Sequence, residues 1–237
     1  MGPRVVINQS NYLPWKGYFD LIHDADIFVF YDDLQFTKND WRNRNRLKTP
    51  RGPAWLTIPV GKDIHRLICD VTLPANDWAR EHWRTIEQNY RATPHFSRYA
   101  PVIQDALLGR AWRTLSDVNQ HLIKVIARDI LGITTTFADS RDYVLRERSQ
   151  GRVLELLGAL GSTTYISGPA AKAYIDETRF GATGIELIWK DYSGYPEYDQ
   201  PYPPFEHAVS VLDLIFSTGP DAPEFIWGWR ASTVPRT

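Results

Sequence analysis

The sequence is poor in several features that would place a protein in a class at once. Its 237 residues include one cysteine, Cys69, which excludes an internal disulfide framework and a zinc site built from cysteines. The formal net charge is −1, so the molecule as a whole has no electrostatic affinity for nucleic acid or for a membrane surface. No apolar stretch reaches the roughly 18 to 20 residues of a membrane span, and no signal peptide is recognisable. We therefore expect a cytoplasmic protein with neither nucleic-acid nor membrane partners.

The sequence also lacks the familiar cofactor and catalytic motifs. It contains no G-x-G-x-x-G, no P-loop and no G-x-S-x-G, and its six histidines show no H-x-x-x-H spacing. We therefore predict no metal site and identify no cofactor. Cys69 lies in "LICDV", which looks like a strand, where a buried and inert thiol is more common than a nucleophile.

What is present indicates an α/β protein. The apolar runs "VVINQ" (5–9) and "IFVFY" (27–31) are typical of buried strands, and Pro14 can open a helix between them. This β-α-β unit begins a parallel sheet. Strand and helix patterns alternate again from residue 134, in "TTTFAD", "GRVLELLGALG", "TTYISG", "PAAKAYID" and "GIELIWKDY". We predict a mostly parallel, Rossmann-like sheet flanked by helices.

Two segments depart from that alternation. Strand-like halves flank "TPRGP" within residues 41–60 and predict an antiparallel hairpin, and residues 66–74 predict a further short strand. Residues 75–132 predict a helical insertion that begins with Asn76 or Asp77 as a cap, that Pro101 can break, and that Gly132 ends. We expect a single domain over residues 1–237, with a late helix stopped by Gly219 and a C-terminal tail from about residue 220.

The stretch "WRNRNRLK" (41–48) concentrates four cations in eight residues. In an extended chain alternate side chains share a face, so the cations would lie on one side and Trp41, Asn43, Asn45 and Leu47 on the other. Arginine suits bidentate capture of carboxylate or phosphate, which makes this strip a candidate anion site. The alternative is neutralisation by nearby carboxylates in ordinary salt bridges. The four cations are Arg42, Arg44, Arg46 and Lys48, and the carboxylates are Asp32, Asp33 and Asp40.

Three loops offer further polar groups. In "YISGPAAKAY", Ser167 or Gly168 caps a predicted helix whose free N–H groups, together with Lys172, could bind an anion. Gln9, Asn11 and Tyr12 follow the first strand at the same edge of the sheet, although such a loop can also be capped by its own side chains. Gln200 lies in a proline- and aromatic-rich stretch (195–207) that predicts a strap over the domain or a pocket lid.

The long N-terminal run "NQSNYLPWKGYFDLIHDADIFVFYDDLQFTKNDWRNRNRLKTPRGPAWLTIPV" resembles the signature of the WbqC-like family. The later motifs "YISGPAAKAYID", "GIELIWKDY", "YPEYDQ" and "VSVLDLIFSTG" are similar to motifs of that family, so the resemblance covers nearly the whole chain. Ser10 departs from the proline usual in the family, and Cys69 matches no cysteine motif of the family. The resemblance implies a role in bacterial polysaccharide or natural-product biosynthesis. The segment 9–30 also has the outline of the first β-α-β unit of cytidylyltransferase-like enzymes, without their histidines.

These observations lead to three hypotheses. The first is a transferase that joins an acyl or aminoacyl group to an amino sugar or small amine, with Asp32 or Asp33 as general base. Its substrate would be a small anionic molecule, a nucleotide sugar or an activated acyl donor that a carrier protein can also supply. The second is a magnesium-dependent nucleotidyltransferase, and the third is a binding module without catalysis. The predicted substrate-binding residues are Gln9, Asn11, Tyr12, Gln35, Arg42, Asn43, Arg44, Lys48, Ser167, Gly168, Lys172 and Gln200.

Overall fold

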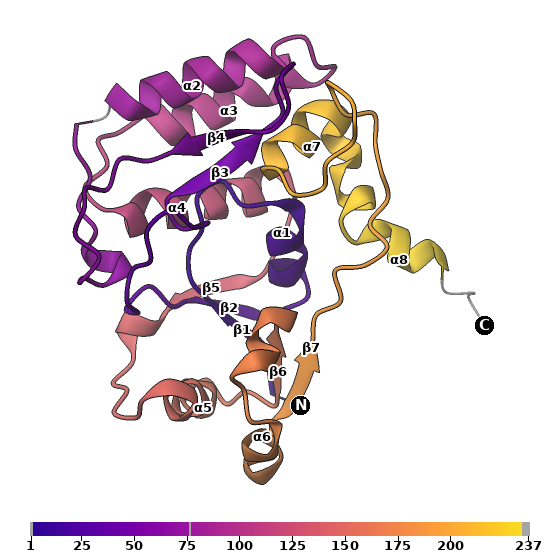
Figure 1. Ribbon diagram of the computed structural model, residues 1–237. Helices are drawn as coiled ribbons and strands as arrows, with labels where there is room; N and C mark the ends of the chain where they lie inside the picture. The colour runs from indigo at the N-terminus through magenta and orange to yellow at the C-terminus, as the bar shows by residue number, and fades with distance from the viewer. Residues whose placement is uncertain (1, 76, 234–237) are drawn as a thin grey trace.

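A five-stranded parallel sheet organises the fold, and the computed structural model describes residues 2–75 and 77–233 (Figure 1). The strands lie in the order β5-β2-β1-β6-β7, which confirms the predicted α/β class. From β1 the chain builds the sheet first toward β2 and β5 and then, on the other side, toward β6 and β7. The switch point therefore lies between β1 and β6. The strands are β1 (Arg4–Asn8), β2 (Ile27–Phe30), β5 (Thr136–Asp139), β6 (Thr164–Ser167) and β7 (Glu186–Trp189).

Side chains alternate between the two faces of the sheet, as the period of two in a strand requires. Val6 and Phe28 point into a large core shared with α1 (Lys16–His23), the hairpin and the helical layer. Val5 and Val29 point into a smaller core with α5 (Ser149–Ala159) and α6 (Glu177–Thr183). Figure 1 shows α5 and α6 on one side of the sheet and the hairpin with α2, α3 and α4 on the other.

The predicted hairpin is present as β3 (Arg44–Leu47) and β4 (Ala54–Thr57), which pair antiparallel. Thr49 and Gly52 exchange backbone hydrogen bonds in the turn, where Gly52 has a φ of 98° that glycine tolerates best. The strand predicted over residues 66–74 is wrong. A 3-10 turn at Ile68–Asp70 replaces it, because the backbone N–H groups of Ile68 and Cys69 bond to the carbonyls of Leu34 and Asp32.

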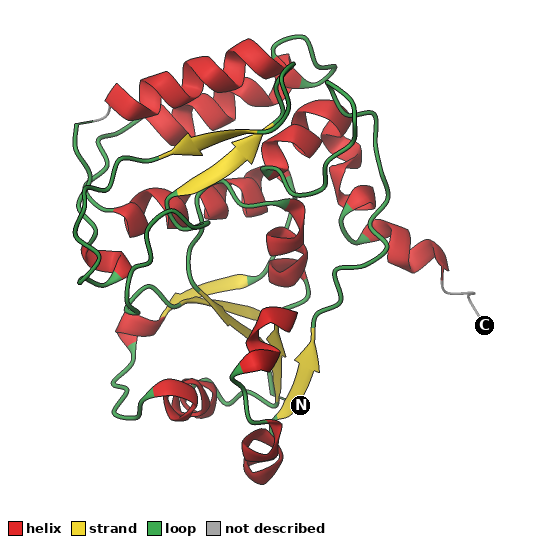
Figure 2. Ribbon diagram, in the orientation of Figure 1, coloured by secondary structure: helices red, strands yellow, loops and turns green. Residues whose placement is uncertain are grey.

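The helical insertion consists of α2 (Asp77–Tyr90), α3 (Phe96–Leu108) and α4 (Leu115–Val125), which continues as a π-helical segment to Ile130. Asn76, one of the two predicted caps of α2, lies outside the described residues. The break predicted at Pro101 is wrong, since α3 runs through it with the proline ring exposed. In Figure 2 the two yellow strands of the hairpin lie between α2 and α3 above them and α4 below them.

The C-terminal segment is more ordered than a tail. After α7 (Val211–Thr218) a 3-10 segment covers Gly219–Phe225 and α8 covers Gly228–Thr233, so the predicted tail is helical in most of its described part. Arg230 of α8 forms ion pairs with Asp20 of α1 and with Asp24, which caps the end of α1. The buried Lys190 that follows β7 pairs with the same two carboxylates. None of the described helices has both the length and the apolar character needed to cross a bilayer.

The segment after β6 was also predicted incompletely. "PAAKAYID" was expected to form a helix, but only a 3-10 turn over Pro169–Ala173 forms there. The α-helix that follows, α6, begins at Glu177 with Asp176 as its cap and was not predicted. The 3-10 turn directly follows the carboxyl end of β6, and α6 contacts β7.

Candidate functional site

A cavity of about 1080 Å³ opens at the carboxyl ends of β1 and β6, at the switch point of the sheet. In open α/β sheets ligands collect at this place, because the loops that leave neighbouring strands in opposite directions part there. Gln9 follows β1, Ser167 ends β6, and Gly168 follows it, so three predicted residues line the same cavity. The cavity is therefore the strongest candidate for a ligand site.

Four arginines and one acidic residue, Glu147, are the charged groups among the described residues that line the cavity. Part of the wall is aromatic, with Tyr31, Tyr165 and Tyr192. An excess of guanidinium groups in a partly enclosed space favours an anionic ligand, because charge interactions strengthen as water is excluded. The four cations are Arg42, Arg148, Arg152 and Arg179.

Arg42 is fixed beside the end of β1. One of its terminal nitrogens donates to the Oε1 atom of Gln9 at 3.0 Å, and the other bonds to Asp40. The Tyr18 hydroxyl donates to the backbone oxygen of Gln9 at 2.8 Å, which holds that residue against α1. The Nε atom of Arg42 is buried and has no hydrogen-bond partner among the described residues. Arg42 therefore lines the cavity as a fixed cation whose terminal nitrogens are held by Gln9 and Asp40.

Arg152 of α5 is also fixed by a carboxylate, that of Asp33, which lies in the loop after β2, the strand next to β1. Its guanidinium forms an ion pair with Asp33 and lies 5.4 Å from the ring centre of Tyr31. Ser140 donates to the other oxygen of Asp33 at 2.6 Å. Asp33 is not among the residues that line the cavity. Its position fits a residue that orients Arg152 better than one that touches substrate.

The beginning of α5 forms another part of the wall. Glu147, Arg148, Ser149 and Gln150 line the cavity, so the first N–H groups of the helix lie beside it. Ser149 has a φ of 50°, a conformation that a non-glycine residue adopts at a cost of about 1 kcal/mol or more. Strained residues of this kind cluster at functional sites.

Asp32 lies away from the cavity, in the layer between β2 and α4. Its side chain is fully buried, and its oxygens accept hydrogen bonds from the Ser10 N–H at 2.8 Å, from the Ser116 hydroxyl and from the Gln120 amide at 3.0 Å. These contacts tie the loop after β1 to α4. Asp32 therefore has the surroundings of a scaffold residue.

The strip of cations in "WRNRNRLK" does not form one surface. The predicted alternation is present from Arg42 to Leu47, where Asn43, Asn45 and Leu47 are buried and the arginines between them are partly exposed. It fails at both ends of the stretch, because Trp41 is exposed and Lys48 is buried. The side chains nevertheless reach different partners: Arg44 stacks on Trp55, Arg46 pairs with Glu206 and bonds to the Ala208 carbonyl, and buried Lys48 bonds to the Pro204 carbonyl. Of the four cations only Arg42 lines the cavity with Ser167.

The remaining predicted residues lie outside the cavity lining. Tyr12 is fully buried and its hydroxyl is 2.9 Å from Nδ1 of His82, while Asn43 donates to the Ile58 carbonyl at 3.1 Å. Gln200 holds the strap by donating to Asp213 at 2.7 Å and to the Glu206 carbonyl at 3.1 Å. Asn11 is partly buried, and Gln35 and Lys172 are exposed.

Sequence reasoning missed Arg148, Arg152 and Arg179. A signal for Arg152 was present, because it lies in the first turn of the helix predicted over "GRVLELLGALG", and the start of a helix that follows a parallel strand lies near the ligand edge of the sheet. Arg148 precedes that predicted helix and is the extended N-cap of α5, so the helical pattern did not indicate it. Arg179 had no such signal, since α6 itself was not predicted.

The comparisons with known proteins agree with the resemblance in the sequence. The profile of the WbqC-like protein family matches residues 9–225. The chain belongs to the WbqC-like protein family. A relative, the "Uncharacterized protein Rv1507c" of Mycobacterium tuberculosis (strain ATCC 25618 / H37Rv), is 44% identical over 226 residues, which cover 94% of this chain and 97% of the relative. No solved structure matches the chain significantly. The WbqC-like region begins at Gln9 and includes all four arginines of the cavity.

Proposed function

We propose that this WbqC-like protein is a biosynthetic transferase that moves an acyl or aminoacyl group from an activated donor to the amine of an amino sugar or small metabolite. The observation that carries the proposal is the arginine-walled cavity at the switch point of the sheet. Nucleotide-linked and phosphopantetheine-linked donors both carry phosphates. A volume of about 1080 Å³ lies at the upper end of the usual range for small-molecule sites, so it suits a donor of that size.

The chemistry proposed for the cavity needs no covalent intermediate. The amine nitrogen of the acceptor attacks the acyl carbon of the donor, the bond from that carbon to the leaving group breaks, and the leaving group departs with its electron pair. Arg42, Arg148, Arg152 and Arg179 bind the phosphates of the donor and fix its position. The attacking nitrogen must lose a proton, and the Glu147 carboxylate is the candidate general base on the cavity wall.

Two alternatives receive less support. A magnesium site at Asp32 and Asp33 would need free carboxylate oxygens, yet Asp32 is buried with both oxygens bonded to protein groups and Asp33 is paired with Arg152. A binding module without catalysis would use the same arginines. The two hypotheses differ in catalysis, because a transferase converts its substrates to product and a binding module does not.

A thermal-shift experiment tests the donor site. We expect acetyl-CoA in excess over its dissociation constant to raise the melting temperature without added magnesium, since a ligand at 100 times its dissociation constant stabilises by about 2.7 kcal/mol. The Arg152→Gln variant should lose this response. Arg146→Gln, an exposed arginine outside the cavity lining, is the matched control and should keep it.

The result that contradicts the donor site is an equal response in wild type and in Arg152→Gln. Stabilisation by ATP or CTP only in the presence of magnesium would instead support the nucleotidyltransferase. Mass spectrometry of reactions with acetyl-CoA and glucosamine then distinguishes a transferase, which produces the amide, from a module that only binds. Glu147→Gln should bind the donor and lose at least tenfold in rate.

A further inference from the structure

Two tryptophans lie together on the surface of the hairpin layer. Trp41 and Trp55 have exposed fractions of 43% and 44%, and they are the two exposed members among nine tryptophans, all within the described residues. Their ring centres are 5.5 Å apart and their planes are tilted by 42°. Large rings are usually buried, so a pair of them left in water indicates a contact surface.

Arg44 adds a cation to this pair. Its guanidinium lies 4.1 Å from the ring centre of Trp55, and its Nε atom is buried without a hydrogen-bond partner among the described residues. Arg42 pairs with Asp40 and Arg46 with Glu206, whereas Arg44 has no ion pair with a described residue. Exposed Thr57 lies opposite Arg44 in the hairpin register. The platform, defined as Trp41, Trp55 and Arg44, therefore combines ring surface with an uncompensated positive charge.

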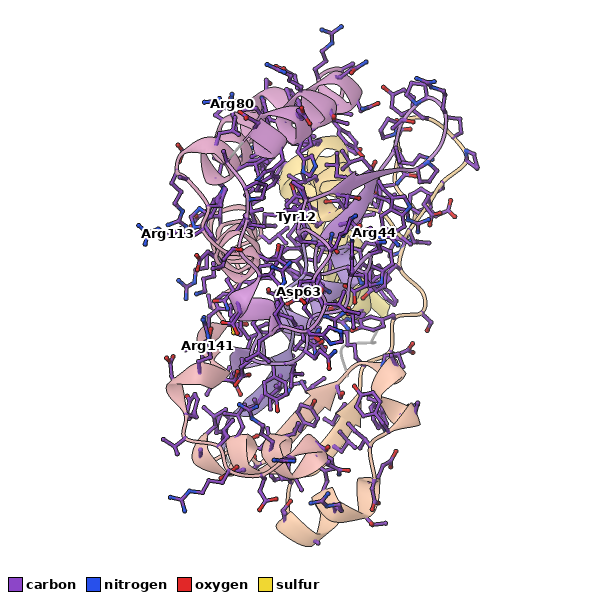
Figure 3. The ribbon with its side chains drawn as sticks, turned by 60° about the vertical axis from the view of Figure 1, so that its left-hand side comes forward. Tyr12, Arg44, Asp63, Arg80, Arg113 and Arg141 are labelled. Atoms are coloured by element: carbon purple, nitrogen blue, oxygen red, sulfur yellow. The ribbon has the colours of Figure 1, made fainter. Side chains whose placement is uncertain are left out.

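The charge of the platform is local. In Figure 3 Arg44 lies to the right of the centre of the view, whereas Arg80, Arg113 and Arg141 lie along its left side. The Arg46 guanidinium also lies 5.7 Å from the centre of the Trp55 ring, but it pairs with Glu206, so the platform has one unpaired cation among the described residues. One unpaired cation matches the charge of a small anionic molecule better than that of a large acidic surface. The tilt of the two planes also matters, because a flat nucleobase can stack on only one of them. A puckered sugar ring can direct its C–H groups toward both.

We propose that the platform is the acceptor subsite and binds the ring of an amino sugar that carries a phosphate or carboxylate. This inference rests on the proposed transferase function and names the chemical class of its acceptor. The sugar ring packs on Trp41 and Trp55, the anionic group pairs with Arg44, and Thr57 offers a hydroxyl at the edge. Trp41 of the platform and Arg42 of the donor cavity are neighbours in the sequence. The two subsites are therefore connected directly along the chain.

The indole N–H signals of the tryptophans in a ¹H–¹⁵N spectrum test the platform, with glucosamine 6-phosphate as the probe. Trp41→Leu and Trp55→Leu identify two of the signals by their loss. We expect saturable shifts of these two signals, and an apparent affinity at least tenfold weaker in Arg44→Gln. Trp189→Leu is the matched control, since Lys172 lies 5.5 Å from the centre of that ring, and it should leave the affinity unchanged.

Two results would overturn the platform. One is the absence of shifts in the Trp41 and Trp55 signals at millimolar probe. The other is a response of these signals to uridine monophosphate but not to glucosamine 6-phosphate, which would make the platform a nucleobase site. Donor binding is measured separately, through the melting temperature and Arg152→Gln. A negative result for the tryptophan signals would therefore not contradict the proposed transferase. A negative result for donor binding would not contradict sugar binding at the platform.

Discussion

Two adjacent carboxylates show how strongly surroundings decide the part that a residue plays. Asp32 and Asp33 have the same chemistry and follow the same strand, so the sequence offered no way to separate them. In the fold they point to different places: Asp32 accepts three hydrogen bonds in the interior, and Asp33 holds an arginine at the edge of the cavity. The groups that donate hydrogen bonds to the two carboxylates lie far away in the sequence, for example Ser10 and Arg152. A local sequence motif therefore cannot predict these contacts.

Asp32→Ala is expected to destabilise the protein by roughly 2 to 4 kcal/mol, because it leaves buried donors of Ser10, Ser116 and Gln120 without an acceptor. Urea denaturation followed by circular dichroism measures this change. Asp142→Asn, at an exposed position, is the control and should keep the stability of the wild type. A stable Asp32→Ala protein that binds donor but does not turn over would restore Asp32 as the general base.

The predicted anion strip illustrates the same limit at the level of single side chains. The predicted alternation of "WRNRNRLK" is confirmed from Arg42 to Leu47, because there it depends only on the period of a strand, and it is wrong at exposed Trp41 and buried Lys48. The Arg46 side chain contacts Glu206 and the Lys48 side chain contacts the Pro204 carbonyl. These partners are about 160 residues away in the sequence, so the local pattern could not predict the contacts. Of the residues predicted for the site, Gln9, Arg42, Ser167 and Gly168 line the cavity.

Elements with a clear period were predicted well from the sequence. The five strands of the parallel sheet, the hairpin and the stripe of α4 all have apolar patterns that a single period explains. The failures occur in short segments at the sheet edge, at residues 66–74 and 169–183. There backbone bonds to neighbouring loops, such as Cys69 N–H to the Asp32 carbonyl, decide between strand, 3-10 turn and helix.

Pro101 provides a test at the level of the helix. It lies inside α3 and removes one backbone donor, yet the helix continues because packing of its buried face holds it. Pro101→Ala should therefore stabilise the protein by about 1 to 3 kcal/mol. The melting temperature measures the gain, and Val102→Ala at the neighbouring exposed position should leave it unchanged. A loss of stability in Pro101→Ala would show that the proline is part of the packing.

At the scale of the whole molecule, one buried histidine should shape the dependence of stability on pH. Burial lowers the pKa of the His82 imidazole from 6.5 to about 4. At pH values between these two pKa values, His82 is protonated in the unfolded chain but stays neutral in the folded chain. The free energy of unfolding therefore falls as the pH falls through this window. The loss from His82 alone is about 2 kcal/mol between pH 7.5 and pH 5.

The His82→Gln variant removes the titrating group but retains a hydrogen-bonding partner for the Tyr12 hydroxyl. We expect its free energy of unfolding to fall less than that of the wild type between pH 7.5 and pH 5, as measured by urea denaturation at both values. Exposed His65→Gln is the control and should follow the wild type. An identical slope in His82→Gln and wild type would assign the pH dependence to other groups.

The walls of the cavity come from segments far apart in the chain, with Gln9 after the first strand and Tyr192 beyond the end of β7. A growing polypeptide on the ribosome therefore lacks part of this cavity until about four fifths of the chain has been made. A ligand that contacts the whole wall of this cavity can therefore stabilise only a chain that extends past Tyr192, and a fragment of fewer than about 190 residues gains nothing from it.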